Sequence, residues 1–229
     1  MGGLAESRRW TVLPSDPAAE RALAGELGVP SLVARVLVAR GHADPDDARA
    51  FLAPSLDASW VDPLRIPGMG AVADRLERAI EAGETIAVFG DFDVDGMTST
   101  CLLTLALREM GATVHPFIPH RFGEGYGLSR EALARVREAC EPDLVVTVDN
   151  GIAAAREVAW LRELGVDVVV TDHHEPADLV PEDVPVTDPK LSADCPSREL
   201  AGAGVALKLV CELGRRRGAE DLWRRYVNG

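Results

Sequence analysis

The sequence predicts an α/β fold with a five-stranded parallel sheet and crossover helices, preceded by a helical N-terminal region. From residue 84 onward, short runs rich in Val and Ile alternate with helical segments, which is the pattern of strands joined by crossover helices. The runs are almost continuously apolar, as strands buried on both faces are. The 229 residues, 47% of them hydrophobic, are enough to bury a core in one large or two small domains.

The predicted elements divide into two regions, a helical region over 1–82 and an α/β domain over 83–229. Helical periodicity and turn-rich breaks predict the first helices over 18–27, 30–40, 45–52 and 69–82. Strands are predicted over 85–90, 113–119, 143–149, 167–172 and 184–188. Further helices are predicted over 98–110, 129–140, 153–164 and 202–217.

Charge and cysteine usage narrow the functional classes. A net charge of -13 argues against a protein that coats nucleic acid through a generally basic surface, but it does not exclude a nuclease, because acidic metal ligands add to the negative count. The four cysteines are widely spaced without a C-x-x-C pair, so neither a disulfide framework nor a zinc knuckle is expected and a reducing cytoplasm fits best. The sequence shows no apolar leader segment and no long apolar run, so secretion and membrane spanning are not expected.

Carboxylate and imidazole side chains follow three of the predicted strands. They are Asp91, Asp93 and Asp95 after the first strand, Asp149 at the end of the third, and Asp172, His173 and His174 at the end of the fourth. The carboxyl ends of parallel strands share one edge, so these side chains are expected to converge. Such a cluster would repel itself without cations, which implies divalent metal ions. Oxygen and imidazole ligands favour Mn²⁺ or Mg²⁺, with Zn²⁺ or Co²⁺ as alternatives.

Two such ions a few ångströms apart would activate water, bind a phosphoryl group and stabilise the leaving oxygen. Each motif also has an ordinary structural interpretation. An Asp-x-Asp pair after a strand is often a loop end or a helix N-cap, and Asn-Gly in VDNG is a strong turn signal. The DHH residues alone would be compatible with a polar surface or an N-cap. Metal-type side chains at three separate strand ends favour the metal site.

Three other motifs share parts of DFDVDG. An EF-hand loop requires Glu at its twelfth position, where this chain has Leu102, so that interpretation fails. A haloacid-dehalogenase-type phosphatase would use Asp93 as nucleophile and Asp95 as acid, but both lysines of the chain lie beyond the DHH motif and the two histidines stay unexplained. It remains the weaker alternative. A dinucleotide-binding domain would need G-x-G-x-x-G where this loop is acidic.

Four motifs together resemble a known family. GDFDVDGMTST, VTVDNGI, VVVTDHHEP, and DPK followed by ELAGAGVALKL occur in the order and spacing of the DHH phosphoesterase superfamily. They closely resemble the RecJ-type single-stranded-DNA exonucleases, and the likeness covers nearly the whole chain, including PHRFGEGYGLS. Other branches more often carry H-x-x-P-D-x-D at the first strand, and Phe89 stands where their first histidine would be. The resemblance implies a Rossmann-like DHH domain over 83–229.

The resemblance also implies roles for the matching polar residues. The catalytic metal ligands would be Asp93, Asp95, Asp149 and His173, with His174 as a further ligand or phosphate contact. Asp91 and Asp172 would orient these ligands, as carboxylates beside metal sites commonly do.

Four further residues are substrate-binding candidates. Arg121 would contact a phosphate, with a surface arginine as the alternative. Tyr126 would stack on a base, with a packing role as the alternative. Gly202 and Gly204 would permit close packing or the approach of a phosphate at the start of the last long helix.

The implied reaction is hydrolysis of single-stranded DNA by metal-activated water, releasing 5′-mononucleotides in the 5′→3′ direction during DNA repair and recombination. Single-strand-binding protein and a helicase are the further partners that this implies. The alternatives are a DHH phosphodiesterase acting on oligoribonucleotides or cyclic dinucleotides, and a non-catalytic scaffold that binds single strands or a replication partner. Members of the family continue into a strand with another aspartate ligand, a second domain and an oligonucleotide-binding fold. The chain is therefore expected to be the N-terminal portion of a longer enzyme, with weak or no activity alone.

Overall fold

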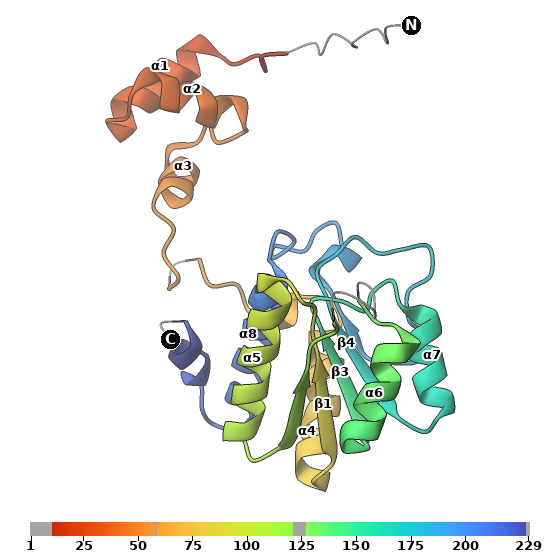
Figure 1. The fold of residues 1–229 in the computed structure, drawn as a ribbon. Coiled ribbons are helices and arrows are strands. Elements are labelled where there is room, and N and C mark those ends of the chain that lie inside the picture. The colour runs from red at the N-terminus through yellow and green to blue at the C-terminus, as the bar shows by residue number, and fades with distance from the viewer. Residues whose placement is uncertain (1–10, 58, 121–126, 228–229) are drawn as a thin grey trace, which may run out of the picture. The chain divides into compact units, whose positions relative to one another are not determined.

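The computed structural model describes residues 11–57, 59–120 and 127–227, and it divides into two compact units, Met1–Trp60 and Val61–Gly229 (Figure 1). The sequence predicts a boundary after residue 82. The structural division falls earlier because the helix over Met69–Ala82 packs against the sheet and against the last long helix. None of the helices in the described residues is long and apolar enough to cross a membrane.

The N-terminal unit consists of three short helices, α1 (Pro17–Leu27), α2 (Ser31–Ala39) and α3 (Pro45–Leu52). Aspartates cap two of them, since Asp16 accepts a hydrogen bond from Ala18 N and Asp44 accepts one each from Asp46 N and Asp47 N. A small apolar core joins the three helices through Leu23, Ala34, Leu37 and Ala48. These helices agree with the predicted ones to within one residue at most ends.

The second unit is built on a five-stranded sheet in which all strands are parallel. Its strands are β1 (Thr85–Phe89), β2 (Thr113–Phe117), β3 (Leu144–Val148), β4 (Asp167–Thr171) and β5 (Val186–Thr187), in the order β2-β1-β3-β4-β5. The predicted fold class is confirmed. β5 is shorter than the predicted strand over 184–188 because Pro185 and Pro189 flank it and lack the N–H group that a ladder needs.

Helices cover both faces of this sheet (Figure 1). One face carries α6 (Arg130–Cys140) and α7 (Ala155–Glu163). The other carries α4 (Met69–Ala82), α5 (Val94–Glu109) and α8 (Gly202–Arg216), and short 3₁₀ turns lie at Pro63–Arg65, Pro189–Leu191 and Leu222–Tyr226. All five residues of β3 are buried, and Phe89 of β1 packs with Leu133 of α6 and Leu161 of α7. The expectation that the central strands are buried on both faces is confirmed.

The sheet order creates a switch point between β1 and β3. From β1 the chain crosses to β2 at one edge, and then it crosses back past β1 to β3. Ligands of open α/β sheets bind in the crevice that such a reversal opens at the carboxyl ends of the strands. The segments that leave β1 and β3 here are GDFDVDG and DNG, which carry most of the predicted acidic residues.

A buried ammonium group in α8 gives a testable dependence of stability on pH. Lys208 is 5% exposed, and its Nζ donates a hydrogen bond to the carbonyl oxygen of Val61. Burial lowers the pKa of Lys208 to about 8 from an ordinary value of 10.5. Between these two pH values the unfolded chain holds more protons than the folded one, so Lys208 makes the free energy of unfolding rise with pH. Below about pH 8, Lys208 is charged in both states, and its buried charge lowers the free energy of unfolding by the full amount.

We expect Lys208→Met to remove this rise. Between about pH 8 and 10.5, the difference in unfolding free energy between the wild type and the variant should change in favour of the wild type by up to about 1.4 kcal/mol per pH unit. Urea unfolding of both proteins at several pH values from neutral to about pH 10 measures the difference. Parallel pH profiles of the two proteins would show that Lys208 titrates normally in the fold.

Candidate metal centre

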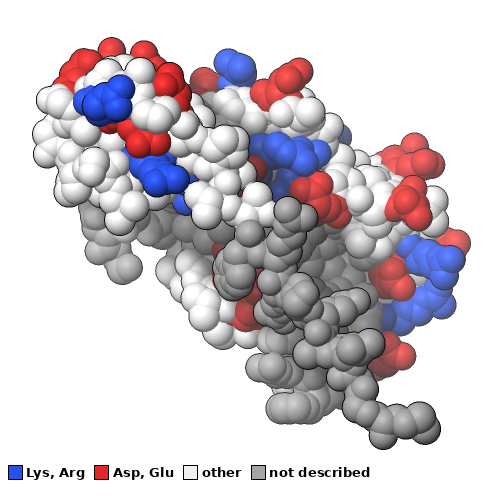
Figure 2. Space-filling view, turned by 90° about the horizontal axis from the view of Figure 1, so that it is seen from above, with Lys and Arg blue, Asp and Glu red and all other residues white. Residues whose placement is uncertain are grey.

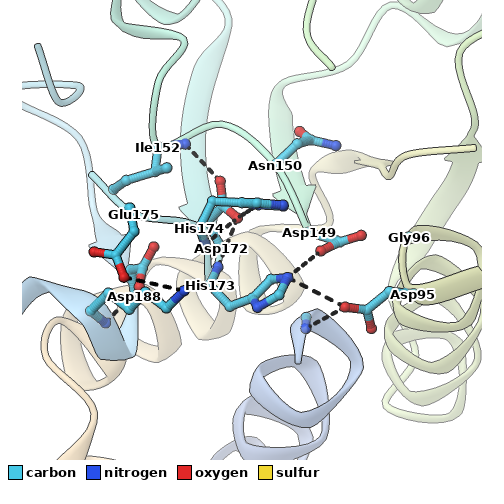
Figure 3. Close-up of polar contacts among 12 residues, drawn as sticks. Asp95, Gly96, Asp149, Asn150, Ile152, Asp172, His173, His174, Glu175 and Asp188 are labelled. Carbon is cyan, nitrogen blue, oxygen red and sulfur yellow. Dashed lines mark hydrogen bonds and ion pairs between the residues drawn. The ribbon is translucent and has the colours of Figure 1, made fainter. Parts of the chain in front are cut away.

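Of the residues predicted to converge, Asp95, Asp149, Asp172, His173 and His174 lie together at the carboxyl ends of β1, β3 and β4 (Figure 3). His173 Nε2 lies 3.0 Å from Asp149 Oδ1 and 3.4 Å from Asp95 Oδ2. Asp149, His173 and His174 each offer one ligand atom, and these atoms lie within 4.8 Å of one another. The end of β3 and the end of β4 therefore form a group of side chains with the spacing of a metal site.

Asp149 is the most buried member of this group, with 2% of its surface exposed. It adopts a left-handed backbone conformation with φ 60°, which aspartate tolerates better than most residues. Its Oδ2 is buried and accepts no hydrogen bond from the described residues. Burial raises the pKa of Asp149, the charges of Asp95 and Asp93 raise it further, and His173 acts in the opposite direction. A buried carboxylate oxygen without a donor is costly, and a bound cation would remove that cost.

Asp172 fixes the orientation of the DHH loop. It is 1% exposed, and its Oδ1 accepts hydrogen bonds from His173 N at 2.7 Å and from His174 Nδ1 at 2.7 Å. Its Oδ2 accepts a hydrogen bond from Ile152 N at 2.9 Å, which ties this loop to the turn after β3. A proton on His174 Nδ1 that faces Asp172 leaves Nε2 of the neutral ring as the ligand atom. The orienting role that the resemblance implies for Asp172 stays a prediction, and these contacts support it.

The same contact sets the protonation of His174 in the absence of divalent ions. The hydrogen bond to Asp172 raises the pKa of His174 to about 9. We expect Asp172→Asn to lower this pKa toward the ordinary 6.5, because an amide cannot hold the imidazolium as a carboxylate does. Titration of the ring resonances by NMR in metal-free buffer checks it, with His42 of the N-terminal unit as an internal reference. An unchanged His174 pKa in the variant would contradict the assigned contact.

The three aspartates after β1 take different positions. Asp93 is the N-cap of α5, since its Oδ1 accepts a hydrogen bond from Gly96 N at 2.9 Å. This cap starts the helix at Val94, whereas the sequence predicted a start at residue 98. Asp91 is fully buried, and its Oδ1 accepts a hydrogen bond from Phe92 N. Neither belongs to the three-residue group, and for Asp93 the N-cap interpretation describes the observed contact.

Asp95 is held by the N-terminus of α8. Its Oδ2 accepts a hydrogen bond from Gly202 N at 2.7 Å, and its Oδ1 accepts one from Ala203 N at 2.8 Å. The free N–H groups and the dipole at a helix N-terminus favour a carboxylate in this position. Because Asp95 also lies beside His173, this contact brings α8 to the edge of the candidate centre (Figure 3).

Gly202 lies directly against Asp149. A Cβ atom at this position would come within 2.6 Å of Asp149 Oδ1, so the close-packing role expected for Gly202 agrees with the structure. At Gly204 the nearest neighbour of a Cβ would be Leu200 Cδ2 at 3.0 Å, the end of a flexible side chain. The approach of a phosphate to either glycine stays a prediction. Arg121 and Tyr126 lie outside the described residues.

The sequence analysis did not single out Asp188, which follows β5 and is fully buried. Its Oδ1 accepts a hydrogen bond from Lys190 N at 2.7 Å, and its Oδ2 has no hydrogen-bond partner among the described residues. Burial, aided by the charge of Asp172, raises the pKa of Asp188 to about 6. Asp188 ends the fifth predicted strand, so the strand-end rule that selected Asp149 would have found it.

Comparison with known proteins assigns this arrangement to a family. The model of the DHH family, N-terminal domain, matches residues 85–227, which includes every strand of the sheet and the candidate centre. The chain belongs to the DHH family. Among its DHH relatives, the single-stranded-DNA-specific exonuclease RecJ of Bacillus subtilis is 41% identical over 208 residues, and the RecJ of Escherichia coli is 38% identical over 188 residues. These matches cover 90% and 81% of this chain but 26% and 31% of the two relatives.

Two solved structures of DHH-family proteins have the same fold over most of this chain. RecJ from Thermus thermophilus, in complex with Mn²⁺, matches 96% of this chain at 35% identity with a TM-score of 0.71, and 31% of that chain is covered. A second structure, exonuclease RecJ bound to manganese, matches 74% of this chain and 44% of its own at 40% identity, with a TM-score of 0.64. The chain therefore spans about a third of the length of the Thermus relative.

Proposed function

We propose that this chain is the metal-binding portion of an exonuclease that hydrolyses single-stranded DNA. The observation that carries the proposal is the buried, unpartnered Asp149 Oδ2 beside two imidazoles, a donor set that suits Mn²⁺ or Mg²⁺. Support for the substrate comes from the RecJ relatives, which are named as single-stranded-DNA-specific exonucleases. A metal is further supported by the related structures, whose titles name Mn²⁺ and Mg²⁺.

In this proposal Asp149, His173 and His174 hold one ion, and Asp93 and Asp95 contribute to a second. The bound ions would supply an activated water molecule and charge stabilisation for the phosphoryl oxygens. Asp172 keeps the His174 ring turned toward the centre, and the N-terminus of α8 keeps Asp95 in place. Arg121 as a phosphate contact and Tyr126 as a base-stacking residue complete the proposed site on sequence grounds.

The cellular setting is part of the same proposal. Hydrolysis from the 5′ end would serve DNA repair and recombination, with single-strand-binding protein and a helicase supplying the exposed strand. The four free cysteines fit a reducing cytoplasm. Manganese is proposed as the working ion.

The test is hydrolysis by the chain supplied with Mn²⁺, on single-stranded DNA labelled at the 5′ end and on a copy labelled at the 3′ end. Oligoribonucleotides and a cyclic dinucleotide serve as competing substrates. We expect labelled mononucleotide to be released only with a divalent ion, and from the 5′ end first. Faster cleavage of RNA or of the cyclic dinucleotide would favour the other phosphodiesterase branches. Saturable Mn²⁺ binding without any hydrolysis would mean that the chain is an incomplete catalytic core or a non-catalytic scaffold.

A further inference from the structure

A cluster of opposite charges adjoins the DHH residues of the candidate centre. Lys190 follows β5 and Glu175 follows the DHH residues, and Lys190 Nζ lies 3.5 Å from Glu175 Oε1. The guanidinium of Arg198 lies 3.3 Å from Glu175 Oε2. Glu175, which both cations contact, directly follows His174 in the chain and lines the same cavity as His174, so the two cations lie near the centre.

The fold holds the guanidinium of Arg198 and the backbone of Lys190, whereas the Glu175 side chain is largely exposed. Arg198 donates hydrogen bonds from one guanidinium nitrogen to the carbonyl oxygens of Lys190 and Ser192, and the backbone N–H of Lys190 is bound to Asp188. The Glu175 side chain is 68% exposed, and its contacts with both cations are long. Ion pairs of this kind contribute little to stability, so a stronger anion can replace the carboxylate.

Space for such an anion adjoins the cluster. A cavity of about 370 Å³ lies at this edge of the sheet, and its lining includes Ile152, His174 and Glu175. Glu175 thus contacts both cations and also borders the cavity. Basic and acidic side chains are intermixed on the described part of the face that Figure 2 shows from above. On a chain with a net charge of -13, a phosphate needs a local pair of cations of this kind.

We propose that Lys190 and Arg198 bind a backbone phosphate of the DNA strand next to the one at the metal centre, and that this phosphate displaces Glu175. The inference rests on the proposed function and names a contact for its substrate. An arginine offers two parallel donors to a phosphate and a lysine offers a point charge, so together they fix one phosphate relative to His174. The bound strand then enters the centre in a defined register.

Glu175→Gln is the most informative variant, because the proposal predicts that it binds DNA more tightly than the wild type. Binding of a labelled oligothymidylate is measured by fluorescence anisotropy at several salt concentrations without divalent ions, so that no strand is hydrolysed. Lys190→Gln and Arg198→Gln should each weaken binding, and the double variant should reduce the slope of log affinity against log salt by about 0.7, the contribution of one phosphate. Glu175→Gln should tighten binding severalfold, and this gain should vanish when Lys190 and Arg198 are also replaced.

Two variants control for charge alone. Glu157→Gln removes the same charge from the lining of the same cavity and frees no cation among the described residues, so it should tighten binding less than Glu175→Gln. Arg162→Gln breaks an exposed ion pair with Asp183 and should leave the slope unchanged. Three results would each overturn the proposal. They are an equal gain in affinity for the two glutamate variants, an unchanged salt dependence of binding when the lysine and the arginine are replaced, and no binding of the oligothymidylate by the wild type.

The Mn²⁺ hydrolysis assay on the same variants separates this inference from the proposed function. If Lys190→Gln and Arg198→Gln hydrolyse DNA and bind it as the wild type does, the proposed nuclease activity is supported and the phosphate contact is contradicted. Binding changes of the predicted signs without hydrolysis by the wild type would support the phosphate contact and leave the proposed hydrolysis by this chain without support. If both hold, the lysine and arginine variants raise KM severalfold and change kcat little, because the groups act on binding the strand.

Discussion

Asp149→Asn is expected to abolish hydrolysis and to weaken Mn²⁺ binding by at least about 100-fold, a loss at the upper end of what even outer-shell partners of a metal cost. Asparagine keeps the size of the side chain but lacks the negative charge that a divalent ion requires. Mn²⁺ titration calorimetry and the single-strand hydrolysis assay measure the two effects. Because Asp149 is the buried member of the group, neither His173 nor His174 can replace its oxygen.

The same substitution should not reduce stability in metal-free buffer. Burial raises the pKa of Asp149, so this residue lowers the free energy of unfolding as the pH rises above the ordinary 3.8, and the loss is complete above the raised pKa. A neutral amide removes this cost, although it also removes the contact with His173. We therefore expect the free energy of unfolding at neutral pH to hold or to rise while function is lost, as at sites where function opposes stability.

Asp183→Asn is the matched control for this variant. Asp183 also adopts a left-handed backbone conformation, with φ 56°, but its side chain is 86% exposed and it lies outside the metal-type group. It should keep both Mn²⁺ binding and hydrolysis. Equal losses in the two variants would mean that asparagine in this backbone conformation, and not the missing charge, causes the effect.

Gly202→Ala should disrupt the centre through packing alone. The added methyl group would lie 2.6 Å from Asp149 Oδ1 and 2.7 Å from Asp149 Cβ, so either α8 or the turn after β3 must move. If α8 moves, Asp95 loses the N–H groups of Gly202 and Ala203. Forced overpacking of this kind typically costs about 1–3 kcal/mol. We expect a loss of that size in urea unfolding, together with loss of Mn²⁺ binding.

Gly204→Ala separates this packing effect from helix propensity. Both glycines lie in the first turn of α8, and alanine favours a helix interior over glycine by about 1 kcal/mol. At position 204 the methyl group meets only the flexible end of Leu200, so this variant should be as stable as the wild type or more stable, with Mn²⁺ binding kept. If the two glycine variants behave alike, the contact between Gly202 and Asp149 is not what positions the carboxylate.

The part of the site that depends on the strand-end rule could be predicted from the sequence. Asp149, His173 and His174 follow buried Val-rich strands, and parallel pairing of β3 with β4 brings their ends together. The predicted strand over 184–188 is longer than β5. The run VPVTD has the composition of a strand, but Pro185 and Pro189 limit its backbone hydrogen bonding in the sheet. The start of α5 was placed too late, because the capping contact of Asp93 depends on which of several aspartates turns toward Gly96.

Contacts between segments far apart in the sequence could not be predicted. The clamp of α8 on Asp95 joins residues more than a hundred positions apart, and no local pattern reports it. The packing of α4 on the sheet, which moves the division of the chain to Trp60, likewise depends on tertiary contacts. Gly202 was a candidate from its helix-terminal position, but its close approach to Asp149 appears only once α8 is placed against β3.

The most direct test of the metal centre is a crystal of the chain soaked with Mn²⁺ and measured for anomalous scattering at an energy that identifies manganese. The account predicts an anomalous peak bounded by Asp149, His173 and His174, present in the wild type and in Asp183→Asn and absent in Asp149→Asn. A peak that persists in Asp149→Asn, or one that lies away from these three side chains while the chain hydrolyses DNA, would contradict it.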